Sequence, residues 1–487
     1  MSNYDVTVIG CGVVGASIAR ELSKYKISVA VLEKEADVSF GTSKANSGII
    51  HAGFHSEPDS LMAKLVVPGN RMFDQLHDEL GFPFERRGEL MVAFTEEDLR
   101  ILQTYYERGE KNKVPYMELI GRERTLELEP ALSPDVMGAL FAPTAGIICP
   151  YEYCFALIGN AKENGVNLFL NQKVIWLGKT SDDYIEIETE AEMKIKTRYI
   201  INSAGLYADD IAKFAGIKDF KIMPRKGEEY LLDRRVGKLV HRVIFPVPTN
   251  TSKGMLVIPT VDGPVMVGPT ALDIENKNDY STTSQGLREV FQHAQRMVPS
   301  IRSSDIITSF VGLRPAATGQ DFIIGKTKLP GFINAAGIQS PGLTASPAIA
   351  KHIRELLVKD GLKLELNPQF DPIKKHAFKR VRQLIEKRNF SEYDKLVQAN
   401  NHYAKLICRC ENVTEAEVIA AIKEGHITMD GIKFATRAGT GRCQGGFCTS
   451  RIMEIIHRET GIPFEEITKK GKGSEIAPFS LNKGVSK

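Results

Sequence analysis

The sequence predicts an α/β protein. A parallel sheet with crossover helices is interleaved with an α+β antiparallel-sheet domain, and a small helical domain ends the chain. A strand, a glycine-rich turn and a helix open the chain, and a similar unit returns about 325 residues later. Between the two units lie short alternating runs typical of antiparallel strands. Four cysteines close together mark the C-terminal part as a separate domain.

Length and composition exclude several classes of protein. The 487 residues suggest about two to four domains, and 43% hydrophobic with 25% charged residues is ordinary globular composition. A net charge of +3 indicates no nucleic-acid partner. No apolar run reaches the ~18 residues of a membrane span, and the N-terminus lacks the pattern of a secretory signal. We therefore expect a cytoplasmic protein.

The first strand and turn have a dinucleotide-binding pattern. Gly10, Gly12 and Gly15 form Gly-x-Gly-x-x-Gly after an apolar, β-branched strand and before a helix. These glycines allow the tight turn, the approach of a pyrophosphate and close helix packing. Glu33 ends the next strand, 23 positions after Gly10, where a ribose hydroxyl needs an acceptor. A merely tight strand–helix turn is the alternative.

A small polar loop, residues 41–48, follows the ribose-binding strand and is suited to contact a flat ring and a phosphate. His51 comes shortly after it, in a small apolar setting where a histidine is either a hydrogen-bonded core residue or a functional group. His55 stands four residues on, a spacing that binds metal on a helix. Gly53 and Pro58 argue against a helix there, so we expect no metal site.

Periodicity predicts the remaining elements. They are a mainly helical region at 60–129 around a strand at 88–94, a helix at 151–164, a parallel strand at 166–174, a hairpin at 184–188 and 193–197, a buried strand at 199–205, an antiparallel sheet within 220–308, a helix at 284–297, and strands at 309–315, 322–324 and 332–336.

The second glycine turn, residues 337–344, leads into a helix that ends near Leu357. Two such units on one sheet suit a flavin dinucleotide better than a nicotinamide one. The second can aim a helix N-terminus at the flavin edge where negative charge develops on reduction, and an ordinary crossover is the alternative. Arg314 sits among apolar residues and needs an anionic partner, either a phosphate, a carboxylate or a structural salt bridge.

Cys408, Cys410, Cys443 and Cys448 lie within about 40 residues. In a cytoplasmic chain such a set indicates a metal centre, either zinc or an iron–sulfur cluster. Beside a flavin a redox centre is the useful choice, so we expect [2Fe–2S], with structural zinc as the alternative. The other three cysteines, Cys11, Cys149 and Cys154, are expected to be packing residues.

These motifs resemble two known families. Residues 1–360 resemble the D-amino-acid-oxidase superfamily of FAD enzymes with a Rossmann-like fold, and within it the glycerol-3-phosphate oxidases and dehydrogenases. The matching segments are 10–15, 43–53, 267–271, 312–315 and 340–347. L-2-hydroxyglutarate dehydrogenases have a similar segment around His51. Residues 405–457 resemble the bacterioferritin-associated-ferredoxin-like [2Fe–2S] domain, which anaerobic glycerol-3-phosphate dehydrogenases carry behind their FAD domain.

The resemblance implies FAD-dependent oxidation of sn-glycerol 3-phosphate, a phosphorylated polyol, to dihydroxyacetone phosphate. Electrons would pass through the cluster to a partner flavoprotein or other acceptor subunit, in an oligomer, with peripheral membrane contact left open. His51 would be the base, with Arg314 acting beside it, and Arg314, Lys253 and Ser340 would hold the substrate. The alternatives are oxidation of L-2-hydroxyglutarate or another 2-hydroxy or amino acid, and a non-catalytic electron-transfer subunit.

The predicted domains are an FAD-dependent oxidoreductase at 1–360, a linker at 361–402, a [2Fe–2S] domain at 403–460 and a tail at 461–487. Within the first, the FAD-binding parts are about 1–75, 150–219 and 309–360, and the substrate parts are about 76–149 and 220–308. The residues expected to bind FAD are Gly10, Gly12, Val14, Gly15, Glu33, Lys34, Thr42, Ser43, Asn46, Ser47, Val174, Ala204, Gly205, Gly312, Gly337, Gly342, Leu343 and Thr344.

Overall fold

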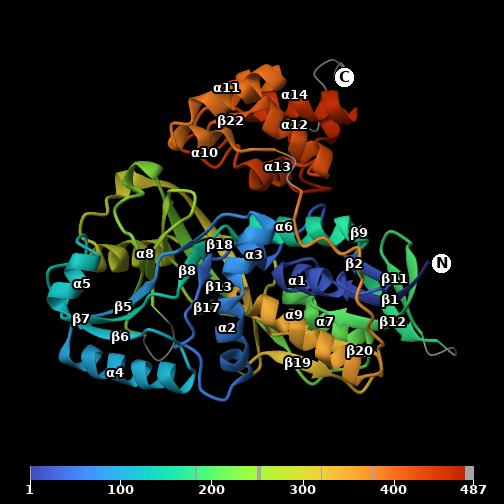
Figure 1. The fold of residues 1–487 in the computed structure, drawn as a ribbon, viewed down its shortest axis with the longest axis horizontal. Helices are drawn as coiled ribbons and strands as arrows, with labels where there is room; N and C mark the ends of the chain where they lie inside the picture. Colours follow the sequence, from blue (N-terminus) through green and yellow to red (C-terminus); the bar gives the residue numbers. More distant parts are fainter. Residues whose placement is uncertain (1, 181–183, 249–253, 320, 376–377, 478–487) are drawn as a thin grey trace, which may run out of the picture. The chain divides into compact units, whose positions relative to one another are not determined.

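The structure, a computed structural model, describes residues 2–180, 184–248, 254–319, 321–375 and 378–477 (Figure 1). The chain divides into two compact units. The first is Met1–Lys34 with Val38–Lys374, and the second is Glu35–Asp37 with Lys375–Lys487. Within the described ranges, no helix is both long and apolar enough to cross a membrane. The predicted α/β class, with its antiparallel-sheet part and helical C-terminal part, is confirmed.

An eight-stranded sheet forms the centre of the first unit. Its strands run in the order β10-β11-β12-β1-β2-β9, with β20 beside β12 and β19 beside β20. The pairs β1–β2, β1–β12, β12–β20 and β2–β9 are parallel. The strand bounds are β1 Ser2–Ile9, β2 Val29–Leu32, β9 Asn167–Phe169, β10 Val174–Lys179, β11 Ile185–Thr189, β12 Lys194–Asn202, β19 Ile323–Lys326 and β20 Phe332–Ala336.

Helices pack on both faces of this sheet because its strands are apolar on both sides. On one face α1, α6 and α9 bury their apolar side chains in one cluster, and α1 and α9 lie side by side in Figure 1. On the other face α7 packs into a second cluster. The helix bounds are α1 Val13–Leu22, α2 Leu61–Arg71, α3 Phe73–Leu80, α6 Pro150–Glu163, α7 Ala208–Phe214 and α9 Gly342–Lys359.

A nine-stranded, mostly antiparallel sheet forms the other part of this unit. Its order is β17-β13-β16-β15-β14-β5-β7-β6, with β18 on β13, and only β14–β5 is a parallel pair among its described strands. Helices α4 (Glu96–Lys111), α5 (Arg122–Leu128) and α8 (Ser284–Met297) contact it. The strands are β5 Glu89–Ala93, β6 Glu118–Gly121, β7 Gly138–Ala142, β13 Ile222–Leu232, β14 Val243–Pro246, β15 Leu256–Pro259, β16 Val265–Gly268, β17 Leu272–Asp273 and β18 Ile306–Ala317.

Three strand predictions need correction. The strand predicted at 309–315 was assigned to the FAD-binding part, but it lies within β18 and pairs with β13 along its whole length. The hairpin strand at 193–197 and the buried strand at 199–205 are one strand, β12, whose first half pairs with β11 and whose second half pairs with β20. The mainly helical region at 60–129 also holds β6 and the short β4 (Phe84–Arg86), which pairs with β8 (Gly146–Ile148), as does β3 (Ile49–Ile50).

The second unit is a small helical domain. Its core is made by α12 (Glu415–Glu424), α13 (Met429–Thr436) and α14 (Thr449–Thr460), beside the two-stranded pair β21 (Leu406–Cys408) and β22 (Val413–Thr414). Thr414 and Glu417 form a capping box at the start of α12. The region predicted as a linker contains α10 (Val381–Glu386) and α11 (Phe390–Ala399). Ile467 of the predicted tail is buried in this core.

Candidate active site and cluster site

The first glycine turn is closed by backbone contacts that exclude side chains. Gly10 has φ +95°, and a Cβ on Gly15 would stand 1.9 Å from the Gly10 carbonyl oxygen. Glu33 Oε2 accepts a hydrogen bond of 2.7 Å from the Cys11 N–H. The carboxylate at the end of β2 therefore supports the turn itself, a role that sequence spacing did not reveal.

The polar loop at 41–48 joins this turn to β18. Ser43 Oγ accepts the Val13 N–H at 2.9 Å, and the Thr42 hydroxyl donates to the Leu313 carbonyl at 2.7 Å. A Cβ on Gly312 would stand 2.1 Å from the Ala45 carbonyl oxygen. The loop thus lies between the N-terminus of α1 and the strand that carries Arg314.

The backbone around His51 is fixed from three directions. The His51 N–H donates to Thr344 Oγ1 at 2.9 Å, and the His51 carbonyl accepts from Asn70 Nδ2 at 2.8 Å. The next N–H, of Ala52, donates to Glu89 Oε1 at 2.9 Å. These partners come from α9, α2 and β5, so the imidazole stands on a rigid support although it follows a two-residue strand.

The His51 side chain is buried, with 7% of the residue exposed. Its Nε2 atom lies 3.2 Å from Ser340 Oγ, which belongs to the second glycine turn. Its Nδ1 atom lies 3.5 Å from Glu89 Oε2. One ring nitrogen therefore faces a hydroxyl at the open side and the other faces a carboxylate, which is an arrangement suited to proton transfer.

Arg314 on β18 and Glu229 on the neighbouring strand β13 each affect the pKa of the other through their charge. The Arg314 guanidinium donates to the Thr270 carbonyl, and burial lowers its pKa to about 10, opposed by the charge of Glu229. Burial raises the pKa of Glu229 to about 7, opposed by Arg314 and by the Ser47 hydroxyl. That hydroxyl lies 3.4 Å from both Glu229 carboxylate oxygens. Glu229 is therefore an acidic residue whose charge acts on Arg314 and which sequence reasoning missed.

Several of the predicted FAD-binding residues lie at the carboxyl ends of the parallel strands. Ala204 and Gly205 follow β12, and a Cβ on Gly10 would touch the backbone of Ser203 and Ala204. Lys34 follows β2, and its ammonium lies 4.6 Å from the Tyr207 ring centre. Lys253 lies outside the described residues. The other predicted positions stand as follows: Val14 on α1, Asn46 and Ser47 in the polar loop, Val174 opening β10, Gly337 after β20, and Gly342, Leu343 and Thr344 opening α9.

These positions fit a flavin dinucleotide. Helices α1 and α9 both begin without an acidic residue in the first turn and without a capping hydrogen bond from the side chain of their N-cap residue. Their dipoles therefore give the helix N-termini positive character, which suits a pyrophosphate and a reduced flavin. A Cβ on Gly15 or Gly312 would clash with the carbonyl oxygen of Gly10 or Ala45, so glycine keeps these segments packed.

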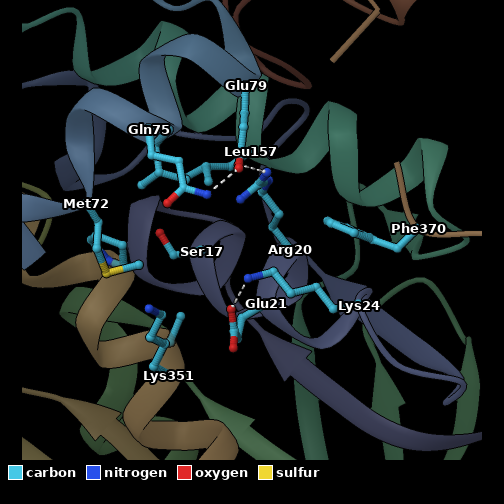
Figure 2. A pocket seen from close by; sticks show the side chains of 13 residues that line it. Ser17, Arg20, Glu21, Lys24, Met72, Gln75, Glu79, Leu157, Lys351 and Phe370 are labelled. Atoms are coloured by element: carbon cyan, nitrogen blue, oxygen red, sulfur yellow. Dashed lines mark hydrogen bonds and ion pairs between the residues drawn. The ribbon is translucent and has the colours of Figure 1, made fainter. Parts of the chain in front are cut away.

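Figure 2 shows a cavity elsewhere, in the helical layer, with a volume of about 260 Å³. Its charged side chains already pair with each other, Arg20 with Glu79 and Lys24 with Glu21, at 2.6 Å in both cases. None of the residues predicted to bind cofactor or substrate lines this cavity. Its lining is Ser17, Arg20, Glu21, Lys24, Met72, Gln75, Leu76, Glu79, Leu157, Pro347, Ala350, Lys351 and Phe370.

The four C-terminal cysteines come together as two pairs. Cys410 Sγ and Cys443 Sγ are 3.6 Å apart and half-buried. Cys408 and Cys448 are buried, and their hydrogen bond is the main cause that lowers the pKa of Cys408 to about 6. A tetrahedral metal with sulfur bonds of about 2.3 Å places two sulfurs about 3.8 Å apart. The distance between Cys410 Sγ and Cys443 Sγ therefore fits two ligands of one tetrahedral metal ion.

Two further features close this site. A Cβ on Gly441 would stand 2.3 Å from Cys410 Cβ, so glycine is required where the second cysteine loop crosses the first. Glu411, directly after Cys410, is buried and accepts hydrogen bonds from Arg382 at 2.9 Å and Arg437 at 3.3 Å. The sequence analysis did not single out Gly441.

Sequence reasoning also missed Glu89, which lies 38 residues after His51. We expected no metal site at His51 and His55 because the sequence argues against a helix there. In the structure both rings nevertheless approach Glu89, with His55 Nε2 3.9 Å from Glu89 Oε2. The only local signal was a glutamate at the start of a strand that otherwise reads as fully apolar.

Comparison with known proteins agrees with this arrangement. Residues 5–356 match the family of FAD dependent oxidoreductases, and residues 406–458 match the BFD-like [2Fe-2S] binding domain. The chain is 44% identical to a glycerol 3-phosphate dehydrogenase of Caloramator mitchellensis, over 97% of this chain and 98% of that one. It is 36% identical to a glycerol 3-phosphate oxidase of Mycoplasma genitalium, over 76% of this chain and 99% of that one.

A solved structure shows the same fold. The dithionite-reduced L-alpha-glycerophosphate oxidase of Mycoplasma pneumoniae with FAD bound superposes with a TM-score of 0.73 at 33% identity, covering 77% of this chain and 98% of that one. The glycine turns and the paired cysteines agree with the cofactors of the two matched families, FAD and [2Fe–2S]. The chain therefore belongs to the FAD-dependent oxidoreductase family and carries a C-terminal BFD-like [2Fe–2S]-binding domain.

Proposed function

We propose that this protein oxidises sn-glycerol 3-phosphate to dihydroxyacetone phosphate. The observation that carries the proposal is the approach of His51 Nε2 to Ser340 Oγ, which places a buried imidazole beside the N-terminus of α9. The names of the two relatives, one similar along nearly its whole length, support glycerol 3-phosphate as the substrate. The reaction needs a base, an anion-binding group and an acceptor for the hydride, and each has a candidate here.

His51 is the proposed base. Its Nε2 atom accepts the proton of the substrate hydroxyl, because a neutral imidazole can do so near pH 7. Ser340 orients that nitrogen through its hydroxyl, 3.2 Å away. When bound, FAD supplies the acceptor for the hydride at N5 and the cluster supplies a one-electron carrier.

Arg314 is the proposed phosphate-binding group. Its guanidinium is held by the Thr270 carbonyl, and its planar fork suits a phosphate bidentately. Glu229 shares the same positive charge and competes with the substrate for it. Lys253 is kept as a proposed second cation for the phosphate dianion, on the strength of the family resemblance.

The proposed FAD-binding residues are those named above at the strand ends, the polar loop and the two helix N-termini. The four cysteines would hold the cluster, with Cys410 and Cys443 as the more exposed pair. We assign residues 1–360 to flavin and substrate binding and 403–460 to the cluster. Since none of the seven cysteines forms a disulfide, we place the reaction in the reducing cytoplasm.

We also propose that electrons leave through the cluster to a partner flavoprotein or other acceptor subunit. An oxidase that passed its electrons directly to O2 would not need a one-electron centre. The Mycoplasma relatives support this reading, because they are named oxidases and align with only 73–76% of this chain. The cluster domain is the feature that distinguishes the two arrangements.

The test is an anaerobic titration of the FAD-loaded protein with sn-glycerol 3-phosphate, followed by the flavin absorbance near 450 nm. Stoichiometric bleaching with dihydroxyacetone phosphate as product is expected. L-2-Hydroxyglutarate and amino acids serve as the comparison substrates. Faster bleaching by L-2-hydroxyglutarate would replace the proposed substrate, and no bleaching by any of them would favour a non-catalytic electron-transfer subunit.

A further inference from the structure

A buried carboxylate lies directly behind the proposed base. Glu89 has no exposed surface, and its Oε2 atom is 3.5 Å from His51 Nδ1 and 3.9 Å from His55 Nε2. The groups around it are otherwise apolar. The Phe245 ring lies 5.8 Å from the His51 ring and 4.7 Å from the His55 ring, and the Phe54 ring lies 4.2 Å from the His55 ring.

The position of Glu89 is fixed by the strand pairing of its backbone and by a hydrogen bond to one of its carboxylate oxygens. It is the first residue of β5, where its backbone is in register with Ala142 and Val243. Oε1 accepts the Ala52 N–H at 2.9 Å, which leaves Oε2 directed at the two imidazoles. A carboxylate held in an apolar core is costly unless it faces a positive group or a strong donor. In the described residues the two histidines are the basic side chains that approach within 4 Å of Oε2.

We propose that Glu89 is a positioning residue for His51. It holds the imidazole with the proton on Nδ1, so that Nε2 presents its lone pair to Ser340 and the substrate hydroxyl. This inference rests on the proposed function only for the identity of the substrate. The contact between Glu89 and His51 does not depend on which substrate is bound.

The proton and electron balance is simple. In the proposed reaction the hydroxyl proton of the substrate moves to His51 Nε2, and the hydrogen on the same carbon would leave with its electron pair to FAD held by the FAD-binding residues proposed above. The O–H and C–H bonds break, an N–H bond forms, and a carbonyl results. His51 then carries a positive charge 3.5 Å from Glu89, and the opposite charge stabilises it. The same Glu89 oxygen also lies near His55, so the negative charge of Glu89 acts on both imidazoles.

A bound metal ion is the competing explanation for why these two histidines and Glu89 lie together. His51, His55 and Glu89 each offer one ligand atom, all within 4.8 Å of one another. One Glu89 oxygen is already engaged by a backbone N–H, and the second nitrogen of His51 is turned to Ser340. The geometry therefore favours a carboxylate–histidine pair.

The experiment replaces Glu89 by Gln, which keeps an oxygen for the Ala52 N–H and removes the charge. We expect the rate of flavin reduction by glycerol 3-phosphate to fall about 10- to 100-fold, the scale for losing a group that orients a functional histidine. Removing a nearby negative charge lowers the pKa of His51. The acidic limb of the rate profile should therefore move to lower pH while the plateau falls.

The matched control is Glu129→Gln. Glu129 is equally buried, accepts backbone N–H groups of His241 and Arg242, and lies 3.6 Å from His241 Nδ1. Its loss should leave the acidic limb in place. A Glu89→Asp variant keeps the charge, so the acidic limb of its rate profile should lie closer to that of the parent protein. It replaces Glu89→Gln if that variant fails to fold.

A readout without substrate keeps the two proposals distinct. In ¹⁵N-histidine-labelled protein, the His51 signal, assigned with His51→Ala, should titrate at lower pH in Glu89→Gln than in the parent protein. An unmoved titration and an unmoved limb would overturn the role of Glu89. Stoichiometric Zn²⁺ bound by these residues would overturn it too. If the parent protein ignores glycerol 3-phosphate but the titration moves, the proposed substrate fails and the role of Glu89 stands.

Discussion

Ser340 Oγ lies 3.2 Å from His51 Nε2, although the two residues are separated by 289 positions in the chain. Ser340 belongs to the turn that follows β20, and His51 follows β3. Thr344, in the first turn of α9, accepts a hydrogen bond from the His51 N–H, and this bond holds the two segments side by side. The proposed catalytic centre is therefore assembled by the packing of α9 on the segment after β3.

Replacing His51 by Ala should lower the rate of flavin reduction by roughly 10²–10⁴, the usual scale for loss of a general base. Substrate affinity should change much less, because the phosphate is held by other groups. Stopped-flow reduction under anaerobic conditions measures both quantities. Ser340→Ala, which removes only the orienting hydroxyl, is the control and should have the smaller effect. Unaltered single-turnover reduction in His51→Ala would remove this residue from the reaction.

Arg314→Lys keeps the charge but loses the bidentate fork. We expect substrate binding to weaken by roughly 1.5–3 kcal/mol, as for a charge-assisted hydrogen bond, which is about 10- to 150-fold in Kd. Arg225→Lys is the matched control, because Arg225 faces Arg314 in register but forms a half-exposed pair with Asp273. That change should stay within about fivefold. If Arg314→Lys bound both phosphate and carboxylate ligands as tightly as the parent protein does, Arg314 would have a structural role only.

Glu229 should make the stability depend on pH. Burial raises its pKa in the folded protein to about 7, above the ordinary 4.5. Its contribution to stability is therefore fully present below about pH 4.5 and is lost as pH rises through about 7, by an amount on the order of 3 kcal/mol. Glu229→Gln mimics the protonated form and should lack this loss.

The measurement is thermal or denaturant unfolding of both proteins between pH 4.5 and 8. The difference in pH dependence, and not the absolute stability, is the readout, because Gln also changes the surroundings of Arg314. Parallel stability curves for the two proteins would show that Glu229 is ionised throughout this range.

Cys408→Ser and Cys443→Ser each remove one thiolate from a different pair and should abolish the cluster. Flavin reduction by substrate should persist, since the flavin and cluster residues belong to separate compact units. Electron transfer to a protein acceptor should be lost. Iron analysis and EPR of anaerobically purified, reduced protein provide the measurement. Cys154→Ala, a buried cysteine outside the set, is the control. One zinc and no iron in the parent protein would make the domain a structural zinc module.

The sequence by itself determined the features that depend on neighbours in the chain. The Gly10–Gly15 turn and the spacing of the four cysteines are local patterns, and each occurs where it was predicted. Local backbone geometry acts over a few residues, so composition and spacing suffice to predict it. The two cofactor families follow from these patterns together with the resemblance.

Only the tertiary structure decided which distant side chains meet. The strand at 309–315 was assigned to the FAD-binding part, yet it lies in β18 and pairs with β13. This pairing brings the strand that carries Arg314 beside the strand that carries Glu229. The position of Glu89 behind His51 depends on the register of β5 with β7 and β14. Strand order and register are set by the burial of whole faces of a sheet, which involves residues hundreds of positions apart. A linear pattern can show that a buried charge needs a partner, but the packed sheet selects that partner.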